Sequence, residues 1–170
     1  MFLGLSLSQF TVLHVVISLL AMASGVAALL AMLGGRRASG LVAFFLGTTA
    51  ATSITGFLFP SQQIGVGHVT GALSLILLLP ATAARYRYRL MHAWRWIHVV
   101  GLAALLYLNV FIGIRQAFAK GPFLHELTSP EAFHVSALLL CAVAALLAAR
   151  RVEPLRRQAW WITHRPSLSR

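Results

Sequence analysis

Five long apolar stretches alternate with short polar segments along the chain. They lie at 10–33, 41–59, 66–84, 97–118 and 132–149, and none of them contains Asp or Glu. A helix needs roughly 20 apolar residues to cross a bilayer core of about 30 Å, and each stretch is close to that length. The pattern predicts an all-α, polytopic membrane protein with a bundle of five transmembrane helices over residues 1–149 and a basic tail at 150–170.

The polar segments carry residues that are typical of turns and helix ends. Gly34-Gly35-Arg36-Arg37 follows the first stretch, Pro60-Ser61-Gln62-Gln63 the second, and Lys120-Gly121-Pro122 the fourth. Before the last stretch, Ser129 is placed to be an N-cap, with Pro130 in the first turn and Glu131 at the positive end of the helix dipole. We therefore expect short loops between successive helices.

The composition agrees with a membrane protein. The chain of 170 residues is 59% hydrophobic and 10% charged, which is more apolar surface than one soluble core of this size can bury. The only cysteine, Cys141, excludes an intramolecular disulfide. Residues 1–9 contain no Lys or Arg, which argues against a cleaved signal peptide, so we expect the first span to be retained.

The basic residues predict the orientation. All but two of the 14 Lys and Arg residues fall on one side of the predicted membrane, and the exceptions are Arg115 and Lys120. Because cytoplasmic loops hold the excess of Lys and Arg, the N-terminus is expected outside and the C-terminus in the cytoplasm. The net charge of +11 thus reflects topology, and it does not indicate a nucleic-acid partner.

The basic tail contains Trp160-Trp161, flanked by Arg156, Arg157 and Arg165. Tryptophan and arginine together favour an interfacial segment that lies on anionic lipids at the cytoplasmic face of the bilayer. The alternative is a docking patch for a partner subunit, because the same residue types dominate protein interfaces. We prefer the lipid anchor.

Small and polar residues at helical spacing predict the faces that pack inside the bundle. The fourth stretch carries the most polar of these faces, and we expect Asn109 and Gln116 to lie in a polar bundle interior. The members of that face are His98, Gly101, Leu105, Asn109, Gly113 and Gln116. In the second stretch, the hydroxyls between Thr48 and Thr55 are expected to bond back to carbonyls one turn earlier rather than to line a polar pathway.

Three histidines are the candidates for chemistry. His14, His68 and His134 each lie about one turn, roughly 5 Å, below the outer surface. His14 and His68 are candidate haem b ligands, with Arg115 beside a propionate, and the three histidines together are candidate metal ligands. The alternative, which we prefer, is that they anchor helices at the interface or form interhelical hydrogen bonds. Since the inner leaflet offers only His98, with His92 in the preceding loop, at most one haem is supported.

Enzyme classes receive little support from the sequence. The only acidic residues, Glu126, Glu131 and Glu153, fall in loops or the tail, so no intramembrane carboxylate is available as a general base or proton relay. The Gly-x-Ser-x-Gly and His-Glu-x-x-His motifs do not occur.

Two segments carry a resemblance. Thr55-Gly56-Phe57-Leu58-Phe59-Pro60 and Leu106-Tyr107-Leu108-Asn109-Val110-Phe111, together with the length and helix count, are similar to segments of small bacterial predicted inner-membrane proteins of unknown function. The resemblance covers the first four helices. It implies a multi-pass protein of the bacterial cytoplasmic membrane and implies no active residues.

These observations favour a non-catalytic accessory or scaffold subunit that packs on a larger membrane assembly or on copies of itself. Two alternatives stay open. One is an electron-transfer or metal-binding membrane protein that uses the three histidines named above. The other is a channel or small-solute carrier lined by Asn109, Gln116 and the segment from Thr48 to Thr55.

Overall fold

The computed structural model describes residues 4, 6–36, 38–60, 63–121 and 129–151. This part of the chain forms five helices: α1 (Leu7–Leu33), α2 (Ser39–Phe57), α3 (Val66–Tyr86), α4 (Trp94–Lys120) and α6 (Pro130–Arg151). Each of them is long and apolar enough to cross a membrane. The predicted all-helical architecture with five candidate membrane spans is confirmed.

All the described helices except α2 extend past the apolar stretches, and serine residues cap the start of two of them. α1 begins at Leu7 instead of residue 10, since the Ser6 hydroxyl accepts from the Gln9 N–H at 3.3 Å and the Gln9 side chain accepts from the Ser6 N–H at 2.9 Å. At the start of α6, the Ser129 hydroxyl accepts from the Ala132 N–H at 3.3 Å. The predicted N-cap at Ser129 is therefore confirmed.

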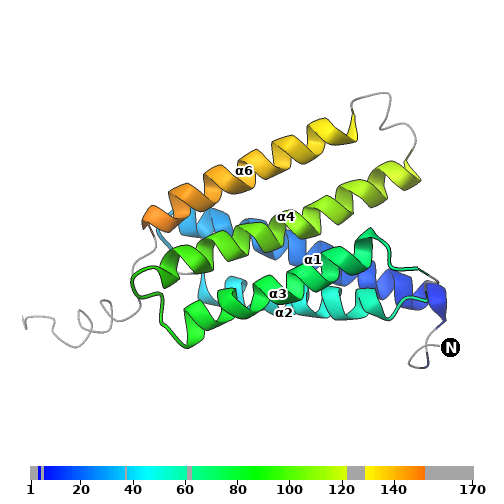
Figure 1. The fold of residues 1–170 in the computed structure, drawn as a ribbon, viewed down its shortest axis with the longest axis horizontal. Coiled ribbons are helices and arrows are strands. Elements are labelled where there is room, and N and C mark those ends of the chain that lie inside the picture. Colours follow the sequence, from blue (N-terminus) through cyan, green and yellow to red (C-terminus); the bar gives the residue numbers. More distant parts are fainter. Residues whose placement is uncertain (1–3, 5, 37, 61–62, 122–128, 152–170) are drawn as a thin grey trace, which may run out of the picture.

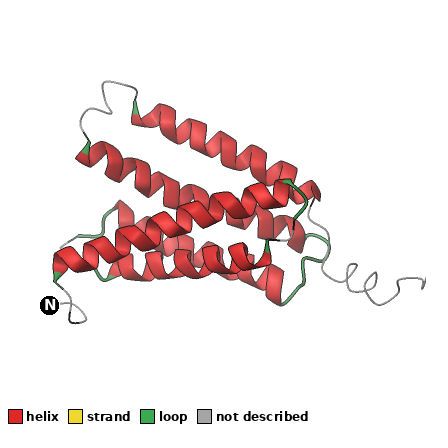
Figure 2. Cartoon of the chain, turned by 180° about the vertical axis from the view of Figure 1, so that it is seen from behind, coloured by secondary structure: helices red, strands yellow, loops and turns green. Residues whose placement is uncertain are grey.

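Successive helices run antiparallel and contact each other in order along the chain (Figure 1). α4 also contacts α1, so it is a neighbour of α1, α3 and α6, and α6 reaches α1 as well. The view from behind shows the same lengthwise arrangement (Figure 2).

The bundle has two ends. At the arginine-rich end α1, α3 and α6 finish and α2 and α4 begin; at the opposite, histidine end lie His14, His68 and His134.

The main hydrophobic core lies toward the arginine-rich end. Its buried members come from all the helices and are Ala28, Leu29, Met32, Val42, Phe45, Leu46, Ala81, Val99, Leu102, Ala103, Leu105, Leu106, Ala145, Ala148 and Ala149. Glycine permits close approach here, because a Cβ on Gly101 would lie 3.0 Å from the Cβ of Ala81. Arg151 ties α6 to α1 by donating to the Leu33 carbonyl at 2.8 Å.

The histidine end is held together differently. The buried residues of α6 are Ala145, Ala148 and Ala149, all in its last two turns, so none lies at this end. Ring contacts join the helices instead: Phe118 and Phe133 have centroids 5.6 Å apart, and Phe10 and Phe59 are 5.0 Å apart. One end of the bundle thus has a close-packed aliphatic core, and the other relies on aromatic and polar contacts.

Candidate functional site

His14 on α1 forms a hydrogen bond to α2. Its Nδ1 lies 2.8 Å from the Thr55 hydroxyl, which itself donates to the Ala51 carbonyl at 2.7 Å. Since the hydroxyl proton is used in that bond, we assign the other proton to Nδ1 of His14, which then donates to Thr55 and leaves Nε2 as an acceptor. The imidazole also meets the Phe59 ring edge-on at 5.1 Å. His14 therefore fixes the end of α2 against α1.

His68 lies in the first turn of α3 and caps that helix. Its Nδ1 accepts from the Gly65 N–H at 3.3 Å, and its ring packs against Phe57 with centroids 5.8 Å apart. A neutral imidazole that accepts at Nδ1 carries its proton on Nε2. In this form Nε2 is a hydrogen-bond donor and offers no lone pair to a metal.

The two histidines approach α2 from opposite faces. Thr55, which binds His14, and Phe57, which contacts His68, are two residues apart in the helix. Successive helical residues are turned by about 100°, so these two side chains point in nearly opposite directions. In this placement the two imidazoles do not face a common point at which one haem iron could bind both. The structure therefore does not favour the haem b hypothesis.

His134 on α6 contacts α4 at Phe111, with ring centroids 4.6 Å apart. Its Nδ1 is buried and has no hydrogen-bond partner within the part of the chain that the structure describes. Across residues 6–36, 38–60, 63–121 and 129–151, no group of three or more His, Cys, Asp or Glu side chains is placed to hold a metal ion. His14, His68 and His134 are therefore not assembled as a three-ligand site, and Arg115 is exposed on α4.

Asn109 lies in the half-buried interior, as expected from the sequence. Its amide donates to the Leu105 carbonyl at 2.9 Å and lies 3.5 Å from the hydroxyl of the fully buried Thr49. The structure corrects the expectation for Gln116, which is exposed. The reason is that α4 buries Phe118 at this level, against Phe133 of α6, and Phe118 points away from the face that carries Gln116.

Most hydroxyls in the bundle bond to their own helix. Thr48 donates to the Phe44 carbonyl at 2.8 Å and Thr55 to the Ala51 carbonyl at 2.7 Å, as predicted for the second span. The buried Thr52 hydroxyl departs from this prediction, because it has no hydrogen-bond partner among the described residues. On α1, Ser18 donates in the same way to the His14 carbonyl at 2.8 Å. The hydroxyls of Thr48 and Thr55 therefore have no proton left to donate to a solute, whereas the Thr52 hydroxyl keeps one.

The sequence did not predict the environment of His98. It is completely buried between α3 and α4, where its Nδ1–H donates to the Ala81 carbonyl at 2.8 Å, while its Nε2 has no hydrogen-bond partner among the described residues. The stripe shared with Gly101 and Leu105 places His98 on a packing face, but it does not reveal a bond to the backbone of α3. His98 thus joins α4 to α3 at Ala81, the residue that also contacts Gly101.

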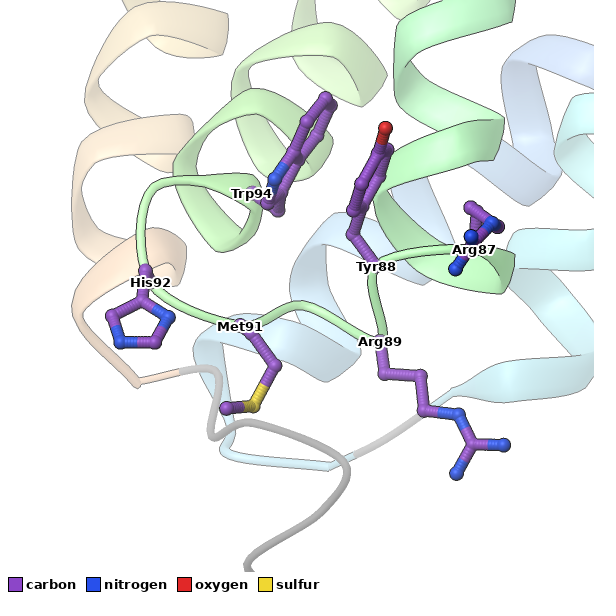
Figure 3. A pocket seen from close by; sticks show the side chains of 6 residues that line it. All are labelled: Arg87, Tyr88, Arg89, Met91, His92 and Trp94. Carbon is purple, nitrogen blue, oxygen red and sulfur yellow. The ribbon is translucent and has the colours of Figure 1, made fainter.

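A second feature that sequence reasoning missed is a hollow in the α3–α4 loop (Figure 3). We call it the loop hollow; its lining residues are Arg87, Tyr88, Arg89, Met91, His92 and Trp94. The rings of Tyr88 and Trp94 are stacked, with centroids 3.7 Å apart. In the sequence analysis the arginines of this loop contributed only to the predicted orientation, although a short loop dense in Arg and aromatic residues is itself a signal for an anion site.

Trp160 and Trp161 lie outside the described residues, as does the rest of the tail from residue 152. No protein-family model, curated protein or solved structure matches the chain.

Proposed function

We propose that this chain is a non-catalytic accessory or scaffold subunit of a larger assembly in a bacterial cytoplasmic membrane. The observation that carries the proposal is the low burial of α6 within the bundle, although this helix contacts both α4 and α1. The buried residues of this helix are three alanines near its end, at positions 145, 148 and 149. A membrane helix docked by so few buried side chains has most of its surface available to another protein.

The exposed face of α6 is continuous and rich in leucine. Its large apolar side chains are Phe133, Val135, Leu138, Leu139, Leu140, Val143, Leu146 and Leu147, and Leu140 is 71% exposed. Because lipid is as apolar as leucine, helices associate in membranes through close van der Waals packing and not through escape from water. A partner helix that packs on this face would supply the contacts that the bundle does not provide.

The test is site-specific photo-crosslinking in native membranes. A photoreactive residue replaces Leu140 on α6, and in a matched control it replaces Leu30 on α1, which is 61% exposed. We expect a discrete protein adduct at position 140 and lipid adducts only at position 30. Mass spectrometry of the adduct identifies either a second copy of the chain or a different membrane subunit.

The proposal is rejected when both positions yield lipid adducts alone. It is also rejected when deletion of the chain leaves the abundance and assembly of the crosslinked protein unchanged, because an accessory subunit must affect the complex it joins. The crosslinking uses the full-length chain and the second measurement removes it entirely, so neither depends on the stability of a truncated form.

The proposed orientation has the N-terminus outside and the C-terminus in the cytoplasm. It is supported by Arg36, Arg87, Arg89 and Arg150 at the arginine-rich end, while Lys120 lies at the end of α4 near the histidine end. A fluorescent reporter that folds only in the cytoplasm should be active when fused to the C-terminus. An active alkaline phosphatase fusion at the same position, which requires export, would reverse the orientation.

A further inference from the structure

The loop hollow lies between the end of α3 and the start of α4 and has a volume of about 550 Å³. Figure 3 shows Tyr88 and Trp94 facing each other on one side of the loop, with Met91 and Arg89 projecting from its opposite side. Arg87, Arg89 and His92 are all exposed. The hollow therefore combines an aromatic wall with three side chains that can carry positive charge.

The loop is held in a conformation that its residues do not favour. Arg89, Leu90 and His92 have φ values of 50°, 59° and 48°, in the left-handed region that non-glycine residues seldom adopt. Leu90 is 2% exposed, and its N–H donates to the Ala84 carbonyl at 2.9 Å. The buried Leu90 thus anchors the loop while Arg89 stays outside. Strained backbone that is fixed by its surroundings is typical of binding sites.

The positive charge around the hollow has no acidic neighbour among residues 6–36, 38–60, 63–121 and 129–151. Glu131 is the one acidic residue in these ranges, and it lies in the first turn of α6, at the histidine end. Arg87 lies 5.9 Å from the centre of the Tyr88 ring, and the nearby Arg85 is only 8% exposed. A site of this charge attracts an anion from outside the chain.

The position of the hollow indicates which anion it would meet in a membrane. It lies directly beyond the ends of two helices that are long and apolar enough to span a membrane. Tyrosine and tryptophan at such ends are typical of the headgroup level of a bilayer. The abundant anion at this level is the phosphate of phospholipids, and the planar guanidinium group matches phosphate oxygens through paired hydrogen bonds.

We propose that the loop hollow binds the phosphate group of an anionic phospholipid. Arg87 and Arg89 contact the phosphate, and the stacked pair of Tyr88 and Trp94 packs against the glycerol and upper acyl chain. The proposal requires only that the chain lies in a membrane; it does not depend on the role as an accessory subunit. Inorganic phosphate has the same chemistry, and the experiment separates the two sources.

The experiment compares two double variants of the full-length chain that each remove two positive charges from the arginine-rich end. R87Q/R89Q changes the hollow, and R36Q/R150Q changes exposed arginines outside it. The purified proteins are exposed to equal amounts of phosphatidylglycerol and phosphatidylcholine, and bound lipid is measured by native mass spectrometry. We expect the unmodified chain to retain phosphatidylglycerol, R87Q/R89Q to bind it at least tenfold more weakly, and R36Q/R150Q to stay within twofold.

Equal losses of phosphatidylglycerol binding in the two double variants would contradict a specific site at the loop hollow, because they would indicate only the general attraction of a basic surface. If millimolar inorganic phosphate displaced the lipid, the ligand of the hollow would be free phosphate and not a phospholipid, and the proposal would be overturned. The variant R87K/R89K keeps the positive charge but loses the planar guanidinium group, so we expect a loss of lipid binding between those of the unmodified chain and R87Q/R89Q. Helix content measured by circular dichroism confirms that each variant is folded before binding is compared.

Discussion

The two ends of the bundle are built on different principles. At the arginine-rich end, glycine and alanine let α3 and α4 approach closely, and His98 bonds across the contact to the Ala81 carbonyl. At the histidine end, half-buried imidazoles bond or pack against the neighbouring helix, as His14 does with Thr55. Both ends therefore use histidine between helices. The two ends differ in how much of the surrounding packing would be lost if the histidine were removed.

The comparison teaches that a histidine in a membrane span does not by itself indicate a cofactor. His98 is enclosed by packed aliphatic side chains, whereas His14 and His68 lie beside the last turn of α2. Each imidazole satisfies a nearby backbone or hydroxyl group. The difference between the ends predicts a graded response to mutation, with the largest losses at the arginine-rich end.

The largest effect is expected from Gly101→Val. A Cβ at this position would lie 3.0 Å from the Ala81 Cβ and 3.6 Å from its Cα, so the new side chain must push α3 away from α4. We expect the free energy of unfolding to fall by about 3 kcal/mol, the upper part of the usual range for overpacking. Unfolding by a denaturing detergent, followed by circular dichroism, measures the loss.

Gly47→Val is the matched control for this substitution. Gly47 also lies within a span, but a Cβ there would have no neighbour within 4 Å. We expect the stability of this variant to stay within about 0.5 kcal/mol of the original, as for most surface changes. Equal losses at the two glycines would show that helix propensity, and not the contact with Ala81, sets the effect.

The sequence was sufficient to predict the helices because lipid imposes a simple rule on them. Any span must be long, apolar and fully hydrogen-bonded within itself, and these requirements are visible in the residue pattern. The pattern did not identify α4 as the neighbour of α1, α3 and α6. That arrangement depends on close contacts such as Gly101 with Ala81, which involve residues far apart in the chain.

His98→Ala should have the second largest effect. The substitution removes the bond to the Ala81 carbonyl and leaves a cavity in a fully buried position. We expect a loss of about 2 kcal/mol in the free energy of unfolding, since a cavity adds to the lost hydrogen bond. His98→Gln, which retains a donor of similar reach, should recover part of it. A loss no larger than that of His14→Ala would contradict the proposed contrast between the two ends.

The candidate site was harder to predict than the fold. Spacing placed His14, His68 and His134 at one depth, but it gave no information on the direction in which each ring points. The structure turns His14 and His68 toward opposite faces of α2, through Thr55 and Phe57. Gln116 was misplaced for a related reason, because a helical stripe predicts burial only where a neighbouring helix continues to cover it.

The smallest effect is expected from His14→Ala, which removes the bond between α1 and Thr55. Interhelical hydrogen bonds in membranes contribute about 0.6 kcal/mol on average, and this one is only half-buried. Thr55→Val should cost a similar amount, and the double variant should cost less than the sum of the two, because both substitutions remove the same bond. Strictly additive losses would show that the two side chains act independently. A loss above about 2 kcal/mol for His14→Ala would exceed what one such bond supplies, and it would reopen the question of a ligand bound at the histidine end.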